Sequence, residues 1–204
     1  MSLSVNRSSG MLSAMVSMQT GGKALTFNRT GLSLMKAGKY EEAAKQFMKV
    51  LDINPNDDVA HDNLGSALRG MGKINEAIDE FNKAKSINPE NETTHNNLGS
   101  AYYDQKRFDD AVVEFKEALR INPKSESARI NLGITYSDMG RTEDAIKELE
   151  KVPNSSDAHT YLGNIYYKKG LFKEAKKEFK QALKLDPKND VARDNLKAAK
   201  EQDN

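Results

Sequence analysis

The sequence repeats itself with a period of about 34 residues, and this period constrains the fold more than any other feature. Glycine returns with spacings of 34, 34, 34 and 30 residues, at Gly31, Gly65, Gly99, Gly133 and Gly163. Alanine returns with the same spacings at Ala43, Ala77, Ala111, Ala145 and Ala175, and all five prolines join the pattern as Pro55, Pro89, Pro123, Pro153 and Pro187. Such a period indicates stacked copies of one small structural unit.

Each unit is predicted to hold two helices. In the third unit, Asn91 is expected to cap a first helix whose apolar stripe includes Leu98 and Tyr102. A glycine follows this helix in four of the five units, at Gly38, Gly72, Gly140 and Gly170, where a left-handed residue commonly ends a helix. The second helix carries Ala111 and Phe115 on one face. One such pair cannot bury its apolar face alone, so the units are expected to stack.

This pattern resembles the tetratricopeptide repeat, whose signature residues in the third unit are His95, Leu98, Gly99, Tyr102, Ala111, Phe115, Ala118 and Pro123. The resemblance covers residues 24–189 and implies an all-α fold, a right-handed superhelical solenoid of antiparallel helix pairs. It divides the chain into an N-terminal segment (1–23), five repeats (24–57, 58–91, 92–125, 126–155 and 156–189), and a C-terminal capping helix and tail (190–204). The fourth repeat lacks four residues before its proline, so its second helix is expected to lose about one turn.

The composition argues against several classes of protein. Lys and Arg total 31 and Asp and Glu total 30, so the basic excess expected of a nucleic-acid-binding protein is missing. The chain has no cysteine, which excludes disulfide and thiol chemistry. It also has no run of about 18 apolar residues, so we expect no transmembrane segment.

Catalysis and metal binding are not expected either. The three histidines, His61, His95 and His159, occupy the same place in their repeats. Equivalent helices in a stack lie about 8–10 Å apart, too far for these side chains to share one zinc ion, and each histidine instead takes the place of a bulky aromatic residue. No spacing supports a nucleophile with its base, and no glycine loop suits a phosphate. We therefore predict no catalytic residue, no metal and no cofactor.

The resemblance implies that the first helices line a concave groove, with positions 2, 5, 6, 9, 12 and 13 of each repeat facing it. The candidate peptide-binding residues taken from these positions are Asn63, Asn97, Asn131, Asp62, Asn96, Ser66, Ser100, Arg69, Tyr103, Tyr161, Asn164, Tyr167 and Asn195. A side-chain amide has a donor and an acceptor, which match one peptide group. Asn63, Asn97 and Asn131 in register would bind about six residues of an extended peptide. The alternative is that these amides are family background and stay hydrated.

Family members that bind the carboxylate tails of heat-shock proteins use lysine and arginine at set groove positions. Neither way of aligning the repeats supplies these cations here. One alignment gives Asp62, Ser66, Asn97, Ser127 and Asn131. Binding of chaperone tails is therefore not expected.

Two segments leave alternatives open. Residues 1–23 are rich in Ser and Met and read as a mobile tail, a targeting segment, or a helix that docks through Met11, Leu12, Met15, Val16 and Met18. Lysines cluster between residues 168 and 188, as Lys168, Lys169, Lys173, Lys176, Lys177, Lys180, Lys184 and Lys188. They form either a solvated face or a site for an anionic membrane surface or an acidic partner.

The sequence thus predicts a non-catalytic adaptor that binds an extended peptide of a partner protein in its groove. The alternative is a self-assembling homo-oligomeric scaffold that uses residues 1–23 and the groove, with peripheral contact to a membrane or another surface. We expect a cytoplasmic protein that does not bind nucleic acid, with organelle targeting by residues 1–23 as the alternative location.

Overall fold

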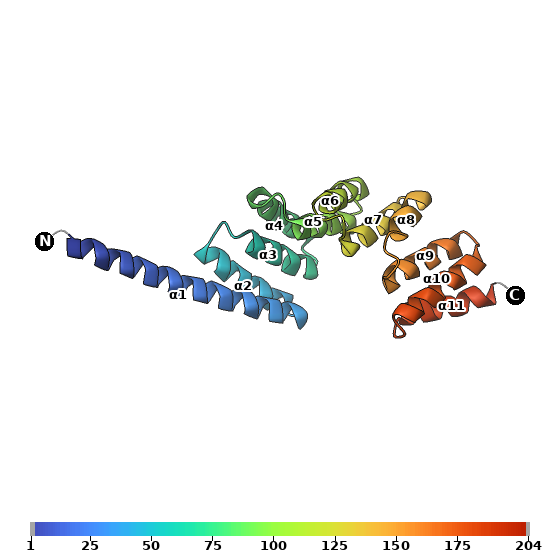
Figure 1. Ribbon diagram of the computed structural model, residues 1–204, viewed down its shortest axis with the longest axis horizontal. Helices are drawn as coiled ribbons and strands as arrows, with labels where there is room; N and C mark the ends of the chain where they lie inside the picture. The colour runs from blue at the N-terminus through green and yellow to red at the C-terminus, as the bar shows by residue number, and fades with distance from the viewer. Residues whose placement is uncertain (1–2, 203–204) are drawn as a thin grey trace. The chain divides into compact units, whose positions relative to one another are not determined.

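The computed structural model describes the backbone of residues 3–202 and the side chains of residues 20–202. Over this range the chain forms helices and no strands, which confirms the all-α repeat fold (Figure 1). The helices are α1 (Leu3–Lys36), α2 (Tyr40–Ile53), α3 (Asp58–Gly70), α4 (Ile74–Ile87), α5 (Glu92–Asp104), α6 (Phe108–Ile121), α7 (Glu126–Asp138), α8 (Thr142–Leu149), α9 (Ser156–Lys168), α10 (Phe172–Leu185) and α11 (Asp190–Glu201).

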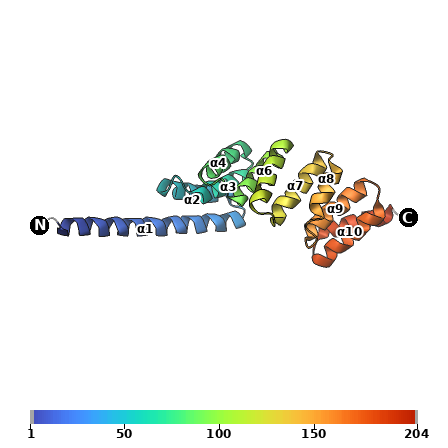
Figure 2. The same ribbon diagram turned by 45° about the horizontal axis from the view of Figure 1, so that its top comes forward.

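The helices belong to two units, Met1–Asn97 and Leu98–Asn204, which divide within α5. In the first unit, α1 packs on α2, α2 on α3, and α3 on α4. In the second unit, α6 packs on α7, α7 on α8, α9 on α10, and α10 on α11. Figure 2 shows the same helix pairs from a second direction. Each unit is therefore a stack of helical hairpins, as the repeat predicts.

The ends of the first helices follow the predicted chemistry. Asn91 accepts a hydrogen bond from the Thr93 backbone N–H, so it caps α5 as expected. Asp57, Ser125, Ser155 and Asn189 cap the corresponding helices by accepting from the N–H three residues further on. The four predicted glycines have φ between 71° and 76°, and the third repeat places Lys106 in the same left-handed conformation at φ 59°.

The core of each repeat is built on one close crossing of its two helices. A Cβ atom on Gly99 would lie 2.7 Å from Cε1 of Phe115, so only glycine lets the aromatic ring pack against the first helix. The ring of Phe115 is 1% exposed. The other repeats make the same contact through Gly31 and Phe47, Gly65 and Phe81, Gly133 and Leu149, and Gly163 and Phe179.

Two helices differ in length from their counterparts. Helix α8 has 8 residues, whereas α2, α4, α6 and α10 each have 14, so it is shorter by more than the single turn that the sequence predicts. Helix α1 has 34 residues against 13 in α3, and it continues through the boundary predicted at residue 24. The stripe from Met11 to Met18 lies outside the side chains that the structure describes.

Candidate functional site

In the first unit, the amides predicted to face a ligand bind neighbouring helices. Asn63 Nδ2 donates to Asn28 Oδ1 at 3.0 Å, which joins α3 to α1. Asn97 Nδ2 donates to Asp62 Oδ2 at 2.9 Å, which joins α5 to α3. Each bond links position 6 of one repeat to position 5 of the repeat before it. These amide nitrogens therefore contribute to the stacking of the repeats, a role that the sequence pattern did not reveal.

Among the acidic side chains of this unit, Asp62 has the largest shift in pKa. Its side chain is buried, and burial raises the pKa of its carboxyl from the ordinary 3.8 to about 6. The nearby Thr94 hydroxyl, which makes no hydrogen bond of standard geometry, and the Asn97 amide lower this pKa by less than burial raises it. The other predicted residues of the unit, Ser66, Arg69 and Asn96, are partly buried, and neither hollow described in this unit contains them.

The histidines at position 4 have polar partners rather than the purely packing role expected of an aromatic replacement. His61 Nδ1 lies 2.6 Å from Glu80 Oε2, and its Nε2 donates to the Pro55 carbonyl at 3.0 Å. His159 makes the same pair of contacts with Glu178 and the Pro153 carbonyl. These side chains tie the two helices of a repeat to the preceding loop. No group of three metal-binding side chains occurs among the described residues.

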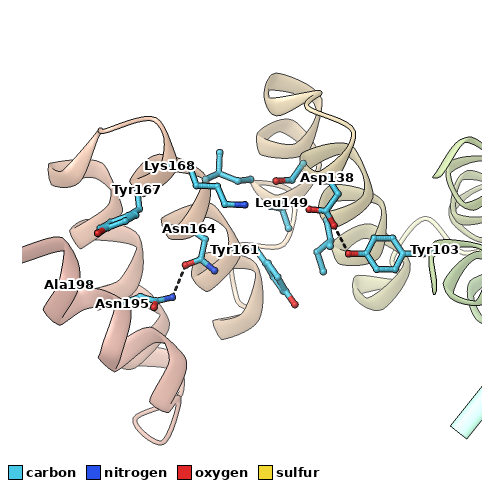
Figure 3. Close-up of a pocket in the computed structure, with 12 residues that line it drawn as sticks. Tyr103, Asp138, Leu149, Tyr161, Asn164, Tyr167, Lys168, Asn195 and Ala198 are labelled. Atoms are coloured by element: carbon cyan, nitrogen blue, oxygen red, sulfur yellow. Dashed lines mark hydrogen bonds between the residues drawn. The ribbon is translucent and has the colours of Figure 1, made fainter. Parts of the chain in front are cut away.

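The second unit contains a pocket of about 420 Å³, which we call the tyrosine pocket (Figure 3). It lies on the first helices of the repeats and on the capping helix α11. Its lining is Tyr103, Ile134, Ser137, Asp138, Leu149, Tyr161, Asn164, Ile165, Tyr167, Lys168, Asn195 and Ala198. The volume is in the range of pockets that hold small ligands or single side chains.

Packing fixes two of the three tyrosines. The Tyr103 ring lies 5.5 Å from Phe108, and the Tyr167 ring lies 5.4 Å from Phe172 in an edge-to-face contact. The Tyr103 hydroxyl donates to the Asp138 carboxylate (Figure 3). Burial, and then this bond, raises the pKa of Tyr103 to about 12. Tyr103 thus presents a neutral, oriented aromatic group at one end of the pocket.

The opposite part of the pocket is polar. Asn195 Nδ2 donates to Asn164 Oδ1 at 2.7 Å, so α11 and α9 share one amide pair here (Figure 3). Between the two ends, Tyr161 is 38% exposed, and burial followed by Asp157 and Asp138 raises its pKa. The lining therefore offers aromatic faces, an amide pair and one lysine ammonium. These groups suit binding of a peptide more than bond-making chemistry.

The structure brings together only part of the predicted set. Tyr103, Tyr161, Asn164, Tyr167 and Asn195 all line the tyrosine pocket, whereas Ser100 and Asn131 of the same unit do not. Asp138 and Lys168 line it too and were not selected from the sequence. Both occupy position 13, which the repeat pattern assigns to the groove, so a fuller use of that pattern would have found them.

The fold and this site define a helical-repeat protein with a ligand-sized pocket on its first helices. Models of the tetratricopeptide repeat match residues 102–156 and 156–189, and a further model described as "TPR repeat" matches residues 31–72 and 65–106. The chain therefore belongs to the tetratricopeptide repeat family.

Solved structures of this family are similar to the chain. MamA is 29% identical, with a TM-score of 0.67, and the match covers 78% of this chain and 95% of MamA. YrrB, a TPR protein with an unusual peptide-binding site, is 20% identical over 91% of this chain and 97% of its own, with a TM-score of 0.64. The first TPR domain of Spaghetti (RPAP3), bound to the HSP90 peptide SRMEEVD, is 24% identical over 58% of this chain and 94% of its own, with a TM-score of 0.56.

No curated protein sequence matches the chain significantly. Among the described residues, no helix combines the length and the apolar character needed to cross a membrane.

Proposed function

We propose that this protein is an adaptor that binds an extended peptide of a partner protein, with an anchor side chain of that peptide in the tyrosine pocket. The observation that carries the proposal is the pocket itself, because three tyrosines and an amide pair converge on one hollow of about 420 Å³. Aromatic residues in a preformed pocket are typical anchors of protein interfaces.

The comparisons support peptide binding in general. YrrB and the Spaghetti domain, both named for bound peptides or a peptide-binding site, share the fold at low identity. The groove of the present chain differs from that needed for an acidic chaperone tail, because the matching positions carry Asp62, Ser66 and Asn97 instead of lysine and arginine. We therefore place the specificity in the tyrosine pocket and not in a cationic clamp.

Tyr161→Ala tests this proposal. We expect the variant to bind peptides selected by the wild-type protein from a random dodecapeptide library about tenfold more weakly or worse, as truncation of an aromatic anchor does. The affinities are measured by fluorescence anisotropy with the selected peptides. Because Tyr161 is 38% exposed, its truncation should leave the melting temperature nearly unchanged.

Two controls sharpen this measurement. Tyr161→Phe keeps the ring and is expected to retain most of the affinity if stacking dominates. Leu171→Ala removes another side chain of similar exposure, 39%, outside the pocket and should bind as the wild type does. Equal affinity of Tyr161→Ala and wild type for every selected peptide would contradict the proposal.

Self-association is the second candidate function, and the length of α1 favours it. Helix α1 has 34 residues where the other first helices have 13, so it runs well past α2 (Figures 1 and 2). This extension beyond α2 is the segment that we expect a second copy of the chain to contact.

Light scattering on the full chain and on residues 24–204 tests the second candidate. We expect the full chain to form a dimer or a larger assembly and the shortened chain to be a monomer, because the contact surface is removed. A monomer in both samples would reject self-association, and an assembly in both would move its interface away from residues 1–23.

A further inference from the structure

Four lysines form a stripe along α10, on a surface that shares no residue with the tyrosine pocket. Lys173, Lys177, Lys180 and Lys184 follow one another at intervals of four, three and four residues, so they lie on one face of the helix. Together with Lys176 they border a hollow of about 730 Å³, the lysine hollow, whose remaining lining residues are Pro153, His159, Glu178 and Gln181.

The single acid of the lysine hollow already has a partner. Glu178 Oε2 lies 2.6 Å from His159 Nδ1, and the other nitrogen of this histidine donates to the Pro153 carbonyl at 3.0 Å. No ion pair of Lys173, Lys177, Lys180 or Lys184 is present among the described residues. These four lysines therefore give one side of the hollow a positive charge that no ion pair among the described residues offsets.

The second repeat contains the equivalent hollow without the lysine stripe, and its one lysine, Lys83, pairs with Glu80. Its lining residues, Pro55, Asn56, His61, Asp79, Asn82, Lys83, Ser86 and Ile87, enclose about 740 Å³. Pro55 and His61 precede Pro153 and His159 by 98 residues each, and His61 contacts Glu80 as His159 contacts Glu178. At that same offset, Asp79, Asn82 and Ser86 stand where the fifth repeat has Lys177, Lys180 and Lys184.

The lysines are not needed to form the hollow. The two hollows have nearly the same volume and the same histidine contacts, so the repeat does not need lysine at these positions. Like charges three and four residues apart also destabilise a helix. A run of lysines that the fold does not require, and that weakens the helix carrying it, indicates a binding role.

The geometry points to an acidic peptide segment as the occupant of the lysine hollow. The stripe from Lys173 to Lys184 covers 12 residues, and its two ends lie about 16 Å apart along the helix axis. An extended peptide covers that distance with about five residues. A segment of this length with several Glu or Asp side chains places its carboxylates beside successive lysines, and its backbone enters the hollow.

A membrane surface fits the same charge less well. The apolar face of α10, with Ala175, Phe179 and Ala182, is buried in the core, so this helix has no apolar face to place in a bilayer. A flat layer of headgroups would also touch only the lysine tips and leave the hollow unfilled. An acidic peptide uses both the charge and the concave shape.

The test exchanges the two hollows. The probe is a fluorescein-labelled peptide with six consecutive glutamates, and the same peptide with six glutamines is its control. The variant Lys177→Asp/Lys180→Asn/Lys184→Ser gives the fifth repeat the residues of the second. We expect the wild type to bind the glutamate peptide in low salt, with affinity that falls as salt rises, and the variant to bind at least tenfold more weakly.

Two more variants separate the site from overall charge. Lys36→Asn/Lys197→Asp/Lys200→Ser removes the same charge from exposed positions outside the hollow and should bind as the wild type does. Asp79→Lys/Asn82→Lys/Ser86→Lys builds the stripe in the second repeat and should add a second binding site for the probe. These surface changes are expected to leave the melting temperature nearly unchanged.

Three results would overturn the inference. The first is equal binding of the glutamate peptide by the wild type and the variant with exchanged residues. The second is an equal loss of binding in the charge-matched control, which would make the effect one of overall charge. The third is binding to phosphatidylserine vesicles, lost in the exchanged variant, without binding to the glutamate peptide, which would assign the stripe to a membrane surface.

Discussion

Phe115→Ala is expected to lower the free energy of unfolding by about 3–5 kcal/mol, as measured by urea denaturation followed by circular dichroism. The ring is 1% exposed and packs between the helices of the third repeat, where Gly99 leaves room for it. It also belongs to the core cluster that includes Leu132 and Tyr136 of α7. Its loss would therefore leave a cavity inside one repeat and loosen the contact with the next.

Two variants of the same helix serve as controls for this prediction. Phe115→Leu should cost less, below about 1.5 kcal/mol, because the fourth repeat places Leu149 against Gly133 at the equivalent crossing. Val113→Ala should change stability by no more than about 0.5 kcal/mol, since Val113 is 63% exposed. If Phe115→Ala were no more costly than Val113→Ala, the close crossing would not be the central contact of the repeat.

The crossing is also the part of the fold that the sequence predicts best. The repeating glycine and alanine, with phenylalanine in four of the five repeats, predict the pairing of two helices. The structure adds the contact itself, in which the ring of Phe115 packs against Gly99. The glycines at position 15 likewise specify the left-handed residue that ends each first helix, and Gly38 and Gly140 adopt it with φ of 71° and 76°. These features follow from local steric rules, so one sequence is enough to predict them.

Features that depend on which side chains meet across repeats are harder to predict. The pattern places Asn63 and Asn97 on the wall of the groove, but it does not show that their amides donate to Asn28 and Asp62 of the preceding repeat. Nor does the pattern show that the Asp138 carboxylate accepts a hydrogen bond from the Tyr103 hydroxyl, since the two residues lie 35 positions apart. Such pairs depend on how one repeat packs on the next, and the sequence period does not determine that packing.

The amide contacts also change how the groove should be tested. Replacing Asn63, Asn97 and Asn131 together with alanine would remove at least the two bonds that Asn63 and Asn97 donate to the preceding repeat, as well as any contact with a peptide. A weaker capture of the partner protein by this triple variant could then result either from destabilised repeats or from lost contacts with the peptide. Tyr161 is the better probe of binding, because it lines the tyrosine pocket and is partly exposed.

Asp62→Asn is expected to stabilise the protein at neutral pH. Burial raises the pKa of Asp62 from 3.8 in the unfolded chain to about 6 in the folded protein, so the folded state holds its proton more tightly. The stabilisation of the folded wild-type protein that comes from this tighter proton binding is fully present below about pH 3.8. It is lost as the pH rises through about 6. The gain of the variant over the wild type should therefore grow by up to about 3 kcal/mol between pH 3.5 and pH 7.

The structure contains a precedent for the substituted side chain. Asn28 occupies the same place in the first repeat and accepts from Asn63 at 3.0 Å, so an asparagine at position 62 retains the acceptor for Asn97. Urea denaturation of both proteins at pH 3.5 and pH 7 measures the effect, because titrations common to the two proteins cancel in the difference. Asp194→Asn, at the exposed equivalent position of the capping helix, should show little gain at either pH. If the gain from Asp62→Asn were equal at the two pH values, the buried carboxyl would not bind its proton more tightly in the folded state. The free energy of unfolding would then not depend on pH through Asp62.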